Sequence, residues 1–132
     1  MSRFYCNPRA IVYSVIIAGA SLSAPLAAMA DDIARGKEIY NGLGACASCH
    51  GVEGKGDGAA AAAMNPKPSD FTAGVYKFDT DGDGKTGSET DIFDVISNGA
   101  MKYSGSPMMS ARADIPEADR KSLAKFIISL KK

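Results

Sequence analysis

Five consecutive residues, Cys46-Ala47-Ser48-Cys49-His50, form the strongest chemical pattern in the sequence. The C-x-x-C-H spacing is the attachment pattern of a c-type haem. Two intervening residues let both sulfurs reach the two vinyl groups on one porphyrin edge as thioethers, and the adjacent histidine then lies under the iron. The sequence therefore predicts one covalent haem c, with His50 as an axial ligand of the iron.

Other chemistries of paired cysteines fit this pattern less well. A zinc site needs four ligands, whereas the chain beyond residue 30 offers two cysteines and one histidine. A thioredoxin-type redox pair needs no following histidine and normally opens a helix in an α/β domain. A structural disulfide between Cys46 and Cys49 stays an alternative for an exported protein.

The second axial ligand is restricted because His50 is the only histidine in the chain. It must be a methionine, solvent or a group from a partner. A methionine favours ferrous iron, raises the reduction potential and closes the iron to other ligands, which suits electron transfer. Each methionine is individually more often a core residue than a ligand, and the candidates are Met64, Met101, Met108 and Met109. Met108 and Met109 follow a loop containing glycine and proline, which can bring a sulfur to the face opposite His50.

An all-α fold must position these groups, with three to four helices and long loops wrapped around the haem. Helices are predicted over residues 32–43, with Asp32 as N-cap, and over residues 88–97. The clearest helical spacing is in the last segment, at Leu123, Phe126, Ile127 and Leu130. Residues 51–68 are rich in glycine, alanine and proline and are predicted to be loop, with one or two helical turns over 59–64. In the first helix, Ile33, Gly36, Lys37 and Tyr40 are predicted to fall on one face.

The first thirty residues have the parts of a secretory leader. Arg3 and Arg9 precede an uncharged run over residues 11–30 that ends in Ala28-Met29-Ala30, an A-x-A cleavage pattern. The alternative is an uncleaved membrane anchor, since about 20 uncharged residues can span a bilayer, but serines and a proline interrupt the apolar run. We expect a leader over residues 1–30, which removes Cys6, a periplasmic monohaem domain over residues 31–132, and no stable membrane anchor after cleavage.

Length and charge limit the remaining alternatives. The chain has 132 residues, enough for one small domain, and all 15 acidic residues but not all 15 basic residues lie beyond the leader. A slightly acidic chain gives no reason to expect nucleic acid or an anionic membrane as the main partner. A domain of about 100 residues buries only a modest core, to which a covalent apolar cofactor adds.

An acidic loop forms a second pattern. Asp79, Asp81 and Asp83, followed by Gly84, match the first half of a calcium-binding loop, D-x-D-x-D-G. Thr90 stands at the twelfth position, where such loops have a glutamate, and no helix is predicted to enter the loop. A solvated turn is the alternative, because aspartate and glycine suit turns. The sequence therefore leaves two interpretations of this loop, a calcium site formed by the three aspartates and a solvated turn without a cation.

Along essentially its whole predicted mature length, the sequence resembles the small single-haem class I cytochromes c of the bacterial periplasm. The resemblance rests on the segment Cys46 to Gly51, the stretches Gly54-Lys55-Gly56-Asp57-Gly58 and Pro66-Lys67-Pro68-Ser69-Asp70-Phe71-Thr72, the segment Pro107-Met108-Met109-Ser110, and the last helix from Asp119-Arg120. It implies the cytochrome c fold and a helix crossing formed by Gly36, Tyr40 and Phe126.

The resemblance also implies two details of the haem site. Met108 takes the family's ligand position, and Met109 stands where the family usually has a proline, so a shift of one residue makes Met109 the ligand. A proline carbonyl accepts the proton of the axial imidazole in the family. Pro66 is the candidate for that role, followed by Pro68.

The function implied by the resemblance is that of a periplasmic electron carrier rather than an enzyme. Electrons would pass to redox partner proteins at an exposed haem edge near Ala47 and Met108, while Lys55, Lys67 and Lys102 are interpreted as ordinary surface charges. Two alternatives stay open. One is a haem-bearing subunit of a periplasmic dehydrogenase or reductase complex, and the other is a ligand-binding sensor or peroxidase-like protein with an open sixth site.

Overall fold

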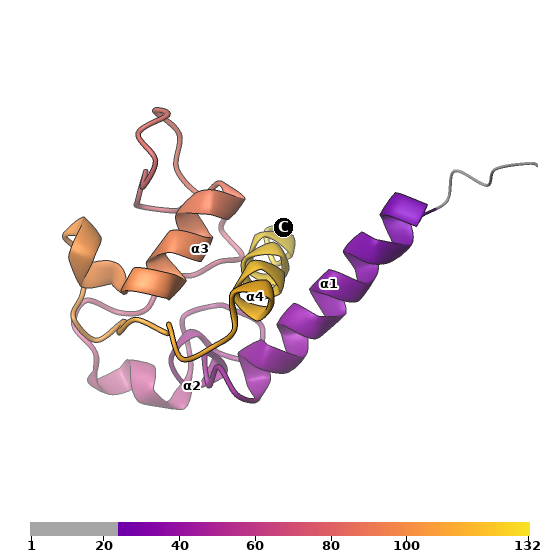
Figure 1. The fold of residues 1–132 in the computed structure, drawn as a ribbon. Coiled ribbons are helices and arrows are strands. Elements are labelled where there is room, and N and C mark those ends of the chain that lie inside the picture. Colours follow the sequence, from indigo (N-terminus) through magenta and orange to yellow (C-terminus); the bar gives the residue numbers. More distant parts are fainter. Residues whose placement is uncertain (1–23) are drawn as a thin grey trace, which may run out of the picture.

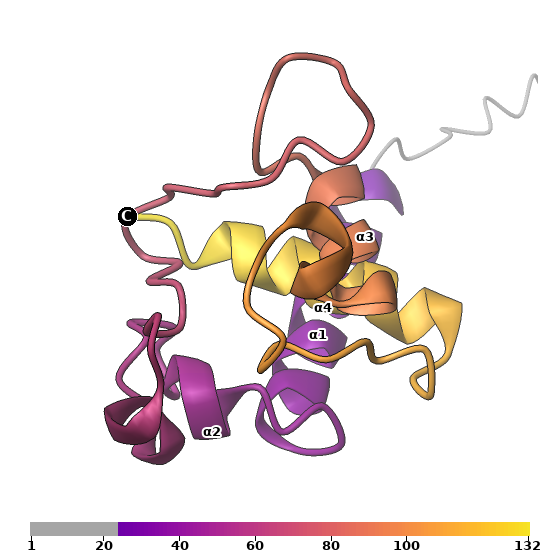
Figure 2. The ribbon, with the colours of Figure 1, turned by 90° about the vertical axis from the view of Figure 1, so that its left-hand side faces the viewer.

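The structure is a computed structural model that describes residues 24–132, so most of the predicted leader lies outside the described residues. Its helices are α1 (Ala24–Asn41), α2 (Ala47–His50), α3 (Glu89–Asn98) and α4 (Glu117–Ser129), with short 3-10 helices η1 (Ala59–Ala63) and η2 (Ala100–Tyr103). Figures 1 and 2 show α4 between α1 and α3, with α2 and η1 on the same side of the molecule. The predicted all-α fold is confirmed.

Helices α1 and α4 cross at Gly36, where the absence of a side chain brings the backbones together. A Cβ atom there would lie 2.1 Å from the Ser122 carbonyl oxygen and 2.7 Å from Phe126 Cβ. Tyr40 packs edge-on against Phe126, with ring centroids 5.2 Å apart, and its hydroxyl donates a 2.8 Å hydrogen bond to the Gly51 carbonyl. The helix crossing that the family resemblance implies is confirmed. The Tyr40 hydrogen bond also anchors Gly51, the residue that follows α2.

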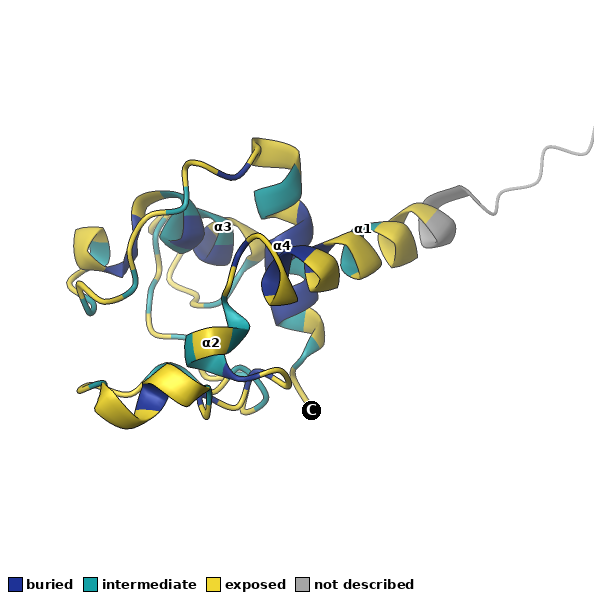
Figure 3. Cartoon of the chain, turned by 90° about the horizontal axis from the view of Figure 1, so that it is seen from below, coloured by how far each residue is buried: buried dark blue, intermediate teal, exposed yellow. Residues whose placement is uncertain are grey.

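The core is built around α4, which packs against α1 and α3. Leu123, Phe126 and Ile127 of α4 are buried against Ile92 and Ile96 of α3, and Figure 3 shows these helices as the most buried part of the chain. Burial of each such side chain contributes about 2 kcal/mol. The helical spacing of the last segment therefore predicted its buried face correctly.

Helix α1 differs from its prediction at the start. It begins at Ala24 rather than Asp32, because its alanine-rich sequence favours helix, and it runs across the predicted cleavage junction after Ala30. Asp32 is therefore not an N-cap; its carboxylate accepts a 2.5 Å hydrogen bond from Lys125 Nζ. Lys37, which was predicted to share a face with Ile33 and Tyr40, is exposed. Ile39, which was not predicted on that face, is buried. Among residues 24–132, no helix is long and apolar enough to cross a membrane.

Helix α3 begins at a capping box. Ser88 Oγ accepts from the Asp91 backbone N–H at 3.0 Å, while the Asp91 carboxylate accepts from the backbone N–H and the hydroxyl of both Ser88 and Thr80. Asp91 is only 2 % exposed. Burial alone would raise the pKa of Asp91, but these hydrogen bonds outweigh it and hold the pKa below its usual range.

We expect Asp91→Asn to lower the free energy of unfolding by about 2 kcal/mol at neutral pH, because charge-assisted hydrogen bonds at the start of α3 are lost. A carboxyl group with a lowered native pKa stabilises the fold above its ordinary pKa, and this stability is lost as the pH falls through the native value. The deficit of the variant should therefore shrink in acid. Urea unfolding at several pH values measures it, with exposed Glu89→Gln as the control. A deficit that is constant with pH would contradict the assignment.

Candidate functional site

A cavity of about 660 Å³ is lined by residues from four stretches of the chain, 44–50, 64–78, 87–100 and 104–112, and by Ile127 of α4. This volume falls within the range of about 300–1,000 Å³ typical of ligand and cofactor sites. Cys46, Cys49 and His50 all line the cavity, and both cysteines are free thiols. The structure thus brings the three predicted attachment residues together on one wall, beside a space that suits a porphyrin.

Helix α2 presents the attachment residues in a single turn. Cys46 is its N-cap and accepts a 2.9 Å hydrogen bond from the His50 backbone N–H. Because residues three apart share a helix face, Cys46 and Cys49 point in similar directions. Burial raises the pKa of the Cys46 thiol to about 11, against a smaller opposing effect of Arg112, so this thiol is protonated at neutral pH.

One nitrogen of the His50 ring is already engaged. Nδ1 lies 3.1 Å from the Ser69 carbonyl oxygen, and since a carbonyl can only accept, Nδ1 carries the proton and Nε2 is left to bind a metal. Burial lowers the pKa of His50, and the Ser69 carbonyl opposes this in part. The neutral imidazole is the form that binds a metal.

The carbonyl that accepts from His50 belongs to Ser69, so the predictions of Pro66 and Pro68 were wrong. The backbone around residues 54–56 explains this difference. Phe71 N–H donates to the Gly54 carbonyl at 2.7 Å, and Gly56 has a positive φ of 73° at a place where a Cβ would lie 2.6 Å from the Pro68 carbonyl oxygen. This close approach holds the chain so that Ser69, not a proline, presents its carbonyl to the ring.

Phe71 is a site residue that the sequence analysis did not single out. Its ring stacks on the imidazole of His50, with centroids 4.4 Å apart and planes inclined by 19°. The Tyr76 ring also stacks with that of Phe71, with centroids 6.3 Å apart. The stack covers one face of the imidazole, and together with Ser69 it fixes the plane of the ring. Only the P-x-P-x-D-F-T stretch pointed to this position.

The methionines differ in their relation to the cavity. Met64, Met108 and Met109 line it, while Met101 lies outside the lining and is 71 % exposed. Met64 follows η1, which packs against α2 itself. Met108 and Met109 lie on the segment that follows η2, where the Met109 carbonyl accepts from the Ala100 N–H at 3.0 Å. Met108 is 62 % exposed and Met109 is half-buried.

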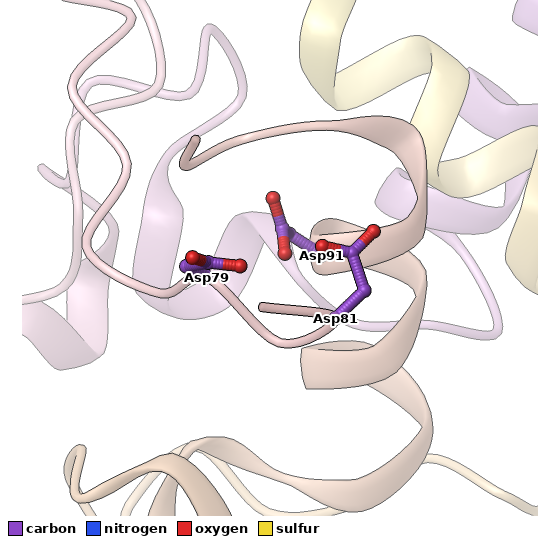
Figure 4. A group of neighbouring side chains, drawn as sticks. All are labelled: Asp79, Asp81 and Asp91. Atoms are coloured by element: carbon purple, nitrogen blue, oxygen red, sulfur yellow. The ribbon is translucent and has the colours of Figure 1, made fainter. Parts of the chain in front are cut away.

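The acidic loop forms a different cluster from the predicted one. Carboxylate oxygens of Asp79, Asp81 and Asp91 lie within 4.8 Å of one another, and Figure 4 shows the three side chains together. Asp83 is not a member of this cluster, and its carboxylate accepts from the Lys85 N–H at 2.8 Å. Asp79 accepts from the N–H groups at 82 and 84, so these hydrogen bonds account for the turn without a cation. Calcium binding stays a prediction.

Thermal unfolding tests the calcium prediction directly. A cation held by this cluster must raise the melting temperature with increasing calcium concentration and lower it with a chelator, because a ligand that binds only the native state stabilises it. Asp81→Asn should reduce that shift, since Asp81 is exposed and contributes to the cluster. A melting temperature that is the same with calcium and with chelator would count against the site.

Comparisons with known proteins agree with this geometry. The family model for cytochrome c matches residues 33–131. No curated protein matches the sequence. Among solved structures, one chain of the reducing HAO-like protein complex of Kuenenia stuttgartiensis is 32 % identical, with a TM-score of 0.62, over 77 % of this chain and 44 % of that one. This chain thus spans less than half the length of that relative. With the family matched over nearly all described residues, the chain belongs to the cytochrome c family, which implies haem c and electron transfer.

Proposed function

We propose that this protein is an exported one-electron carrier with a single covalent haem c. The observation that carries the proposal is the wall of the cavity, where two free thiols and a histidine with its Nδ1 engaged by Ser69 lie on one helical turn. This arrangement matches what the family's cofactor requires of its protein: two attachment points and one oriented imidazole. A carrier function follows when the iron is also closed on its other side.

The residues of the chain would hold, orient and shield the group. Cys46 and Cys49 would form thioethers to it, and Nε2 of His50 would bind the iron. The bound haem supplies reversible one-electron exchange between ferric and ferrous iron. Ser69 and Phe71 keep the imidazole in one orientation, and such outer contacts tune a metal site. The apolar lining limits water, which influences the reduction potential.

Met108 is the proposed sixth ligand, with Met109 as the fallback. The support is that both side chains belong to the lining of the cavity that Cys46, Cys49 and His50 also line, together with the alignment of the last helix with the family. A methionine at this position would leave no site for another ligand. That feature separates a carrier from a sensor or peroxidase-like protein, whose iron must stay open.

The surface near the cavity would receive redox partners. Met108 is an exposed residue of the cavity lining, and Ala47 is half-buried next to Cys46 in the chain, so the haem edge would be reached there. Of the three lysines considered, Lys55 pairs with Glu53 at 2.6 Å and Lys102 Nζ lies 5.5 Å from the Tyr103 ring, which fits ordinary surface charges. Only Lys67 lines the cavity.

A role as the electron-transfer subunit of a redox complex is the second candidate. The observation that favours it is the likeness to a chain of a reducing HAO-like protein complex. Copurification of a stoichiometric enzyme subunit with the tagged protein, stable in moderate salt, would favour this role over a freely diffusing carrier.

Export to the periplasm is part of the proposal. The support is the leader pattern over residues 1–30, with cleavage after Ala30. N-terminal sequencing of the purified protein tests it: a first residue of Asp31 supports cleavage, and an intact amino terminus contradicts it.

Absorption spectroscopy of the haem-loaded protein tests the carrier function. The ferric protein should show the weak absorption band of a methionine–iron bond, and the reduced protein should not change its spectrum under carbon monoxide. Rapid binding of carbon monoxide together with the absence of that band would contradict the carrier proposal and favour an open-site haem protein.

Met108→Ala should abolish the methionine–iron band and open the iron to carbon monoxide. It should also lower the reduction potential, because water does not favour ferrous iron as a thioether does. Met109→Ala is the matched control, since it removes the same side chain one residue away and should leave the band in place. Absorption spectra and redox titrations of both variants measure the effects. The reverse result would make Met109 the ligand.

A further inference from the structure

Arg112 connects the two walls of the cavity. Its backbone N–H donates to the Ile96 carbonyl at 2.8 Å, which fixes its segment to α3. Its side chain crosses to the loop before α2, where Nη1 donates to the Gly44 carbonyl and Nη2 donates to the Leu43 carbonyl at 3.0 Å. Arg112 thus contacts two residues that are distant from it in the sequence, by 68 positions for Gly44 and by 69 positions for Leu43.

The guanidinium is held in place by a second partner. Asp114 accepts from Nε and from Nη2, both at 2.9 Å, and this pairing lowers the pKa of Asp114. The Arg112 side chain is 24 % exposed and belongs to the cavity lining. A planar guanidinium with five donors can serve two carbonyls and a carboxylate at once, which a single ammonium group cannot do in the same geometry.

The two ends of this connection are the two parts of the proposed haem site. Leu43 and Gly44 immediately precede the turn that carries Cys46, and Gly44 is tightly packed, since a Cβ there would lie 2.6 Å from the Ile39 carbonyl oxygen. At the other end, Arg112 follows Met108 and Met109 by only a few residues. A displacement of this segment would move both sulfurs relative to His50.

We infer that Arg112 is a positioning residue that clamps the methionine-bearing segment to the haem-attachment loop and so keeps the sixth ligand on the iron. The inference rests on the proposed His/Met ligation. A thioether is a weak ligand, and a displacement of about 1 Å at a site is enough to impair it. When the clamp is weakened, the segment spends more time away from the iron and an external ligand gains access.

The test compares haem-loaded Arg112→Lys, Arg112→Gln and Asp114→Asn proteins with wild type. Two quantities are measured: the intensity of the methionine–iron band and the affinity of ferric protein for added imidazole. Apparent affinity scales with the population of the open form, so we expect imidazole to bind about tenfold more tightly to Arg112→Gln. Arg112→Lys should show a smaller increase although its charge is kept, and Asp114→Asn the smallest.

Arg35→Gln is the matched control. Arg35 also makes a paired contact with an aspartate, Asp119, at 3.0 and 2.9 Å, but it joins α1 to α4 and does not line the cavity. The control should lose a similar surface contact and keep the wild-type band and imidazole affinity. Equal effects in Arg35→Gln and Arg112→Gln would show that general stability is responsible and would overturn the inference.

The outcomes separate the clamp from the proposed function. In one outcome, the wild-type protein shows the methionine–iron band and all three clamp variants bind imidazole with wild-type affinity. This result overturns the clamp and leaves the carrier proposal intact. In the other outcome, the wild-type protein lacks the methionine–iron band. This result contradicts both the carrier proposal and the clamp, which rests on it. Because Arg112→Gln is the variant most at risk of not acquiring haem, the graded pair Arg112→Lys and Asp114→Asn decides the question in that case.

Discussion

Replacing both Cys46 and Cys49 by alanine will abolish covalent haem in the purified protein. The two thiols lie on one helical turn at the wall of the cavity, and we propose no other covalent attachment. The protein should also lose stability, because the cavity of about 660 Å³ would no longer hold a group bound to the native state. Haem staining of a denaturing gel and intact mass spectrometry measure the loss directly.

Single replacements and Cys6→Ala complete this experiment. Each single variant should keep at most one thioether, and reduced spectra in alkaline pyridine distinguish one thioether from two. Cys6→Ala should retain full haem, because the sequence places Cys6 in the leader. Covalent haem that persists in the double variant would contradict the attachment scheme.

Gly36→Ala will destabilise the fold by about 3 kcal/mol or more, a large part of the total for a small domain. The added Cβ would lie 2.1 Å from a backbone oxygen of Ser122, so it cannot be accommodated by rotating a side chain. Helices α1 and α4 would have to separate, which also displaces Tyr40 from Phe126. Guanidinium unfolding of the haem-loaded protein, followed by circular dichroism, measures this cost.

Gly82→Ala serves as the control for that substitution. Gly82 has a positive φ of 77°, but nothing lies within 4 Å of a Cβ placed there. Its cost should be limited to the backbone conformation, about 1 kcal/mol. Equal destabilisation by the two variants would show that the helix crossing does not depend on the absence of a side chain at Gly36.

The parts of the fold that depend on local pattern could be predicted from the sequence. Leu123, Phe126 and Ile127 follow the helical period and are buried in α4, and the helix predicted over residues 88–97 is observed as α3, one residue later at each end. The wall formed by Cys46, Cys49 and His50 follows from their spacing alone. The start of α1 could not be predicted in this way, because the alanines before Asp32 fit a leader as well as a helix.

Contacts between distant segments could not be predicted. The carbonyl that orients His50 depends on how the backbone turns after Pro68, which residue types do not specify, so Ser69 was missed. The replacement of Asp83 by Asp91 in the acidic cluster has the same origin, since Asp91 joins through α3. Arg112 gave no local sign of its role, because its partners Leu43 and Gly44 lie far away in sequence.

A spectroelectrochemical titration of the haem-loaded protein tests the central claim most directly. One His/Met haem that carries electrons should be reduced and reoxidised reversibly, with both directions following a single one-electron curve at one midpoint potential. Hysteresis between reduction and oxidation, more than one transition, or a potential that shifts when carbon monoxide is added would contradict a closed one-electron carrier.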